Sequence, residues 1–104
     1  MAGKIIWSLQ ARDDLRDIVS YIAADNPSAA QSFGILLMSK MDVLTNFPKL
    51  GRVVPEEGDE NIREIIVRPY RIVYQVLTHR NAVAIVRIWH GARGEPEIPA
   101  RLEF

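Results

Sequence analysis

The chain has 104 residues, and its 13 Lys and Arg side chains balance 13 Asp and Glu side chains. This length fits one compact domain, and zero net charge argues against a protein that coats nucleic acid through bulk charge. The absence of cysteine excludes disulfides, thiolate metal sites and cysteine nucleophiles. The longest apolar run, residues 82–86, is too short for a membrane span, and the first residues lack a signal-peptide core. We therefore expect a cytoplasmic protein without membrane association, forming a single domain over residues 1–104.

The N-terminal half predicts a strand followed by two helices. Residues 4–7 are branched or aromatic, as in a short β-strand. Ser8 suits the N-cap of a helix, and apolar residues then recur at helical spacing over residues 15–22. Asn26-Pro27 ends this helix and begins a second one, whose apolar stripe covers residues 30–44. Two helices joined by so few residues should form an antiparallel hairpin.

The C-terminal half changes from helical to strand periodicity. Residues 48–61 contain Pro, Gly and an acidic cluster, which predicts a loop that is solvated at its acidic end. Three strand-length runs of branched and aromatic residues follow, at Ile62–Val67, Tyr70–Leu77 and Val83–Trp89. Residues 91–104 predict an irregular tail. The order β-α-α-β-β-β indicates an α+β domain in which a helical hairpin packs on one face of an antiparallel sheet.

Basic side chains concentrate in the predicted sheet. Between positions 62 and 93, Glu64 is the single acid among six arginines, namely Arg63, Arg68, Arg71, Arg80, Arg87 and Arg93. Guanidinium groups suit phosphate and carboxylate recognition. The arginines could form a sheet surface that faces a polyanion or an acidic partner. They could equally be solvated edge residues whose stems cover apolar surface, and both interpretations stay open.

His90 follows the last predicted strand and lies near Arg93 in the sequence. A histidine beside arginines could act as general acid or base in phosphodiester cleavage. It could instead pack beneath the tail with its ring hydrogen-bonded to the backbone, and the residues alone favour this structural role. His79 and His90 make no recognisable zinc pattern, and the chain has no phosphate-loop fingerprint. We therefore expect no metal and no cofactor.

The second predicted helix carries more apolar surface than one core stripe requires. Ile35, Leu36 and Met38 lie off the stripe. Such a helix is either deeply buried or covered by another chain. Because one of only two helices must face solvent, we favour a partner that covers these three residues.

Several short motifs follow one another in an order that resembles the RelE/ParE toxin superfamily, over about residues 4 to 95. The motifs are Ala11-Arg12-Asp13-Asp14-Leu15, Asn26-Pro27, Phe47-Pro48, Gly51-Arg52, Arg63-Glu64, Tyr70-Arg71-Ile72-Val73-Tyr74 and Val86-Arg87-Ile88-Trp89-His90-Gly91-Ala92-Arg93. Arg63-Glu64 and His90-Gly91-Ala92-Arg93 make the chain look more like the ParE branch.

The resemblance implies a RelE/ParE-like fold and the toxin role of a type II toxin-antitoxin, or plasmid stabilisation, module. ParE-like toxins inhibit DNA gyrase and replication until a cognate antitoxin neutralises them in a hetero-oligomer. RelE-like members instead cut messenger RNA on the ribosome. By this resemblance, the partner over Ile35, Leu36 and Met38 is the antitoxin.

Residue by residue, Arg71 matches the arginine of the family's Tyr-Arg-x-Val-Tyr strand, which contacts phosphate in the RelE branch. His90 and Arg93 stand near the C-terminal catalytic residues of nuclease members, so these three are the catalytic candidates if the chain is an endoribonuclease. However, Lys49 is the last lysine and the tail lacks a tyrosine, so the lysines and tyrosine of a RelE centre have no counterpart.

These departures favour a toxin that is not an enzyme. We expect a basic surface facing its target, formed by Arg63, Arg71, Arg87, His90 and Arg93. The gyrase-binding toxin is the first hypothesis, and a ribosome-dependent messenger RNA endoribonuclease is the alternative. A third possibility is an inactive toxin that only binds its antitoxin.

Overall fold

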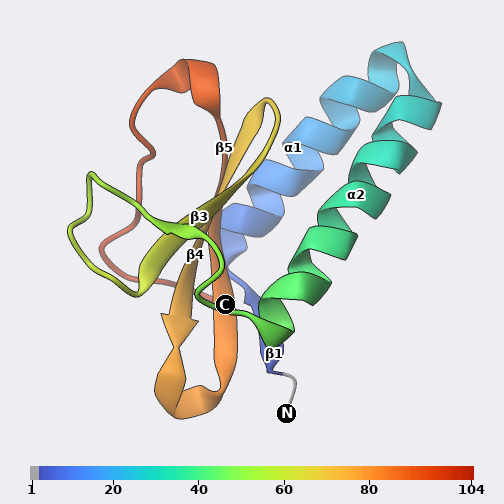
Figure 1. Ribbon diagram of the computed structural model, residues 1–104. Coiled ribbons are helices and arrows are strands. Elements are labelled where there is room, and N and C mark those ends of the chain that lie inside the picture. Colours follow the sequence, from blue (N-terminus) through green and yellow to red (C-terminus); the bar gives the residue numbers. More distant parts are fainter. Residues whose placement is uncertain (1–2) are drawn as a thin grey trace.

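The computed structural model describes residues 3–104 and confirms the α+β fold, with two helices covering one face of a five-stranded sheet (Figure 1). The elements are β1 (Lys4–Trp7), α1 (Leu9–Asp25), α2 (Pro27–Asn46), β2 (Arg52–Val53), β3 (Ile62–Val67), β4 (Tyr70–Leu77) and β5 (Ala82–His90). Short 3-10 helices occupy Thr78–Arg80 and Gly91–Arg93. The strand order across the sheet is β1-β5-β4-β3-β2.

The sheet is mixed, and the expectation of a wholly antiparallel sheet was wrong for β1. This strand runs parallel to β5, with Ile5 opposite Val83. Short connections between β3, β4 and β5 fix their antiparallel pairing. The direction of β1 is not fixed locally, because its partner β5 lies far along the chain. The two-residue β2, inside the predicted loop, pairs with β3 through Arg52 and Val53 and is too short to show a sequence period.

The two helices begin where the sequence predicts. The Ser8 hydroxyl accepts the Ala11 N–H at 3.0 Å and donates to the Val86 carbonyl, which ties the start of α1 to β5. The Asn26 side chain accepts the Ala29 N–H at 3.1 Å and caps α2, with Pro27 as its first residue. Both caps satisfy backbone donors that lack a partner within the helix.

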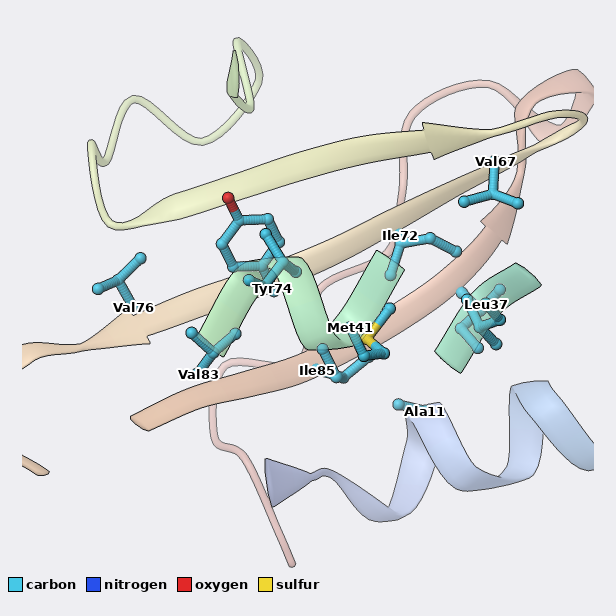
Figure 2. Close-up of a cluster of buried hydrophobic side chains, with 11 residues drawn as sticks. Ala11, Leu37, Met41, Val67, Ile72, Tyr74, Val76, Val83 and Ile85 are labelled. Carbon is cyan, nitrogen blue, oxygen red and sulfur yellow. The ribbon is translucent and has the colours of Figure 1, made fainter. Parts of the chain in front are cut away.

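A single apolar cluster fills the space between the helices and the sheet (Figure 2). From α2, the predicted stripe supplies Leu37, Met41 and Leu44 to this cluster, and Ala30 of the same stripe is also buried, which confirms its orientation. From the sheet, the cluster receives Val67, Ile72, Tyr74, Val76, Val83, Ile85 and Ile88. The helix α1 contributes the fully buried Ala11 and the partly buried Leu15 and Ile18. This face of the sheet is therefore closed by side-chain packing.

Tyr74 links this core to the loop that follows α2. Its ring is buried, its hydroxyl accepts the Gly51 N–H at 2.9 Å, and burial raises the pKa of its phenol. A Cβ at Gly51 would collide with the Glu64 carbonyl oxygen and would lie 2.6 Å from the Tyr74 hydroxyl oxygen. Only glycine allows the loop after α2 to pass this close to β3.

The opposite face of the sheet, which we call the open face, carries a smaller apolar cluster. Val54, Val73 and Val86 are buried there, with Ile98 and Leu102 packed against them. The cover consists of the loop before β3 and the chain after β5, both on the side away from the helices (Figure 1). The tail is irregular as predicted, apart from its first 3-10 turn, yet it packs on the sheet.

Within residues 3–104, no helix is long and apolar enough to cross a membrane.

Candidate functional site

The register of the sheet places two of the predicted basic residues on the open face. Side chains at directly opposed positions of neighbouring strands project from the same face. Arg71 on β4 is opposite Trp89 on β5, and Arg87 is opposite Val73, which belongs to the apolar cluster of the open face. Arg71, Arg87 and Trp89 therefore share that face.

Two other members of the predicted basic surface project toward the helix side. Arg63 is opposite Tyr74, and His90 is opposite Tyr70, whose ring packs against the core beneath the helices. Arg63 donates to the carbonyl oxygens of Gly51 and Glu60, at 2.9 and 2.8 Å, and so holds the ends of a loop together. The five residues do not form one continuous surface.

Arg71 is enclosed by carboxylates. Its Nε donates to Glu64 Oε1 at 2.5 Å, and its Nη2 donates to Glu56 Oε1 at 3.1 Å. The Glu64 side chain is fully buried, and its second oxygen accepts a bond from Arg52 Nε at 2.6 Å. The hydrogen bond to Glu64 is the main cause of a raised pKa for Arg71, and the bond from Arg71 lowers the pKa of Glu56. The charge on Arg71 is therefore already balanced within the chain.

The acidic end of the loop is exposed as predicted, and Glu56 in addition pairs with Arg71. Its carboxylate turns toward Arg71, because the loop folds over the open face. Attraction between the opposite charges favours this pairing, and the Glu56 carboxylate stays partly exposed to solvent.

Arg87 is also paired within the chain. It makes two bonds to the Asp14 carboxylate, at 2.8 and 3.0 Å, and donates to the Glu97 carbonyl at 2.9 Å. The bond to Asp14 is the main cause of a raised pKa for Arg87. Asp14 also accepts the Ile88 N–H. The pairing of β5 with β1 ends at Ile85, so this side chain from α1 supplies a hydrogen-bond partner to the part of β5 that β1 does not reach.

Trp89 contacts two arginines of the predicted basic surface. The Arg93 guanidinium carbon is 3.8 Å from the indole centroid, and that of Arg87 is 4.9 Å away. The indole Nε1 donates to the Gly94 carbonyl, and Trp89 is almost fully buried. Stacked guanidinium groups gain from the ring quadrupole, so Trp89 orders both arginines. Arg93 is the exposed member of the predicted basic surface.

His90 caps the short helix that follows β5. Its Nδ1 accepts the Ala92 N–H at 3.0 Å, which places the proton of the neutral ring on Nε2. The ring meets Tyr70 edge to face, with centroids 5.3 Å apart. The backbone hydrogen bond agrees with the structural role that the residues alone favoured, but the ring packs against Tyr70 on the helix side and not beneath the tail.

A small hollow of about 110 Å³ lies beside His90. Its lining residues are Asp14, Asp17, Ile18, Tyr70, Ile88, His90 and Arg93. Of the three catalytic candidates of the nuclease alternative, the structure brings His90 and Arg93 to this hollow. Arg71 is not among the residues that line it.

The acidic partners of the arginines were missed by the sequence analysis. Glu64 offered a signal, because a lone acid among six arginines in a predicted sheet invites pairing. Asp14 offered none for this role, since an acid in the first turns of a helix is already explained by the helix dipole.

Ile35, Leu36 and Met38 lie outside the core, with exposed fractions of 65%, 45% and 52%. Their exposure agrees with the helical pattern, and their role in antitoxin binding stays a prediction. Further exposed apolar side chains lie nearby in the sequence, at Val43, Phe47 and Leu50. A hollow of about 390 Å³ lies between α2 and β3. Its lining residues include Lys40, Val43, Leu50, Ile65 and Ile66.

Among residues 3–104, no three His, Asp or Glu side chains gather where they could hold a metal ion.

Residues 5–94 match a family described as the ParE toxin of the type II toxin-antitoxin system parDE. The chain belongs to the RelE/ParE superfamily of type II toxins. Among curated relatives, Toxin RelE2 of Caulobacter vibrioides is 36% identical over 92 residues, covering 88% of this chain and 98% of that toxin. The family assignment therefore extends over nearly the whole domain of this toxin.

Solved structures show the same fold at low sequence identity. The chromosomal ParDE system of P. aeruginosa matches with a TM-score of 0.68 and 17% identity, covering 86% of this chain and 96% of that one. The toxin-antitoxin complex RelBE2 of Mycobacterium tuberculosis matches with a TM-score of 0.62 and 18% identity, covering 86% and 99%. The matching family is thus named after ParE, whereas the curated relative is named after RelE.

Proposed function

We propose that this toxin acts as a ParE-like inhibitor of DNA gyrase, in the cytoplasm, and that it blocks replication without catalysing a reaction. The pairing of its arginines is the observation that carries this proposal. A nuclease needs cationic groups free to meet the charge that develops on a phosphate. Arg71 instead donates to Glu64 and Glu56, and Arg87 donates to Asp14. The match of residues 5–94 to the ParE family supports the same branch.

A supercoiling assay with purified gyrase tests the proposal. The toxin should inhibit supercoiling and stabilise a gyrase–DNA cleavage complex at a modest molar excess. Unchanged supercoiling and no cleavage complex at a large excess of folded toxin would reject gyrase as its target.

A RelE-like endoribonuclease is the second candidate. The 36% identity to a toxin named RelE2, and the shared hollow of His90 and Arg93, favour it. Primer extension on transcripts from expressing cells would then show cuts in phase with codons. His90→Ala and Arg93→Ala should abolish these cuts, whereas a gyrase-directed toxin yields none from the unmodified chain.

An inactive toxin is the third candidate, and growth measurements distinguish it. Induced expression without antitoxin should reduce colony counts if the toxin is active. Normal colony counts with confirmed soluble, folded protein would identify a chain that only binds antitoxin.

We also propose that a cognate antitoxin binds the exposed face of α2 through Ile35, Leu36 and Met38, giving a hetero-oligomer. Three apolar side chains in one patch favour a partner that buries them, since burial of each contributes about 1.5–3 kcal/mol before the costs of association. The RelBE2 structure, described as a toxin-antitoxin complex, supports a partner of this kind.

Leu36→Asp tests this surface against Ser20→Asp, which adds the same charge on an exposed part of α1. Leu36→Asp should raise the dissociation rate of the co-expressed antitoxin at least tenfold, and Ser20→Asp should leave it nearly unchanged. Both variants should unfold at the wild-type temperature. Equal dissociation rates would place the antitoxin elsewhere.

A further inference from the structure

The chain continues past the family match as a segment that crosses the open face of the sheet. Residues 95–104, which we call the strap, follow the region 5–94 that matches the ParE family. From the end of β5 the strap runs back along the side of the sheet away from the helices (Figure 1).

The strap is attached to the open face at a few defined points. Ile98 and Leu102 pack against Val54, Val73 and Val86. The Glu97 carbonyl accepts a bond from Arg87 at 2.9 Å, and the Glu103 carbonyl accepts the Leu9 N–H at 2.7 Å. These contacts link the strap to β5 and to the start of α1.

The way the strap is held makes it separable from the domain. Pro96 and Pro99 have no backbone N–H, so the segment cannot extend the hydrogen-bond ladder of the sheet. Its apolar contacts with the cluster of the open face come from two partly buried side chains, and Pro96 is its one buried residue, whereas α2 alone contributes four buried residues to the core. A segment with few buried apolar contacts opens at a lower free energy than the core that supports it.

The side chains beneath the strap would suit contact with a macromolecule. Val73 and Val86 form an apolar strip on the open face. Arg87 lies next to this strip, and one of its N–H groups donates to the Glu97 carbonyl of the strap. Any large partner that approaches Arg87 along this strip meets Ile98 and Leu102 first.

We propose that the strap is an autoinhibitory cover: it occupies the open face, and it must be displaced before the toxin can engage its target there. This inference rests on the proposed toxin function but not on the identity of the target. It predicts that loosening the strap increases growth inhibition while the two-helix core stays folded.

The test combines Ile98→Ser with Leu102→Ser, which removes both apolar side chains that contact the cluster, and uses Ala100→Ser as the matched control on the exposed part of the strap. Because the chain has no cysteine, Val73→Cys adds a single thiol beneath the strap as a reporter. With Ellman's reagent, this thiol should react at least tenfold faster in the double variant than in the control. A chain ending at Gly94 provides a second way to remove the strap if the double variant is poorly soluble.

Growth is then compared at equal amounts of soluble toxin, without the reporter mutation and without antitoxin. Colony counts should fall at least tenfold further for the double variant, or for the chain ending at Gly94, than for the control. Faster thiol reaction with no additional growth inhibition would overturn the proposal, as would an unchanged thiol reaction. The gyrase assay is read separately, so a failure to inhibit supercoiling rejects the proposed target without deciding the role of the strap.

Discussion

The two faces of the sheet are built in opposite ways. The helix side is covered by two long helices, and its cluster includes Leu37, Met41 and Ile72 without an ion pair among them. The open face is covered by a loop and the strap, and its small apolar cluster adjoins paired arginines. The stability of this toxin therefore comes mainly from one face, while its charged chemistry is concentrated on the other.

This division explains how a neutral chain can hold arginines in a sheet. On the open face, Glu64 is buried between Arg52 and Arg71, and Asp14 reaches from α1 to Arg87. A buried charge is tolerated when it is paired and hydrogen-bonded. If one partner is removed, nothing offsets the free energy required to bury the other. We therefore expect the free energy of unfolding to depend on single charges at the open face and on the volume of single side chains at the helix side.

The largest effect should come from a cavity on the helix side. Leu37→Ala removes a side chain that is 1% exposed, and we expect the free energy of unfolding to fall by about 3 kcal/mol. Urea denaturation measures this loss. The neighbouring Leu36→Ala is the control, because Leu36 is 45% exposed and should cost about 0.5 kcal/mol or less. Equal losses at the two positions would contradict the assignment of the core face.

A smaller effect should follow from removing one charge on the open face. Glu64→Gln keeps the shape of the side chain but leaves Arg71 with only Glu56, so we expect a loss of about 2 kcal/mol in the free energy of unfolding. Asp13→Asn breaks the exposed pair with Arg16 and should cost about 0.5 kcal/mol or less. If the two variants are equally stable, the network around Glu64 contributes nothing beyond an ordinary surface pair.

The smallest effect concerns the alkaline stability set by Tyr74. Burial raises the pKa of Tyr74 above its ordinary value of 10.0, so the unfolded chain loses this proton at a lower pH than the folded one. The free energy of unfolding should therefore be unaffected by this group below pH 10 and should fall as the pH rises above it, by at most about 1.4 kcal/mol per pH unit.

Tyr74→Phe should make this alkaline decline shallower, although the loss of the bond from the Gly51 N–H lowers stability at neutral pH by about 1 kcal/mol. Chemical denaturation at a series of pH values measures both effects. The same slope in the variant and the wild type would show that another group governs alkaline unfolding.

The sequence predicted the parts of the fold that local chemistry controls. Asn26 and Pro27 define the turn between the helices because one caps and the other starts a helix. The stripe from Ala30 to Leu44 identifies the core face because helical periodicity relates residues on a single element. The direction of β1 escaped prediction, since it depends on a partner far along the chain.

The candidate site was less predictable, because it depends on which face each strand residue occupies and on what covers it. Arg63 and Arg71 both looked like members of one basic surface, yet their cross-strand partners place them on opposite faces. The pairing of Glu56 with Arg71 depends on the path of a loop, which composition does not specify. The count of charges along the sequence therefore located the arginines but did not show that carboxylates of the same chain neutralise Arg71 and Arg87.

The parallel pairing of β1 with β5 has a consequence for the synthesis of this toxin. Lys4 is opposite Ala82 and Trp7 is opposite Ile85, so the first of the five strands to be synthesised pairs with the fifth. At roughly 5–20 residues per second, β1 waits roughly 4 to 16 seconds for its partner. Until then its edge is unpaired, and α1 lacks the strand on which Ser8 and Asp14 are anchored. The nascent chain can complete its sheet only after β5 has emerged, which delays the appearance of the folded toxin until all five strands have been made.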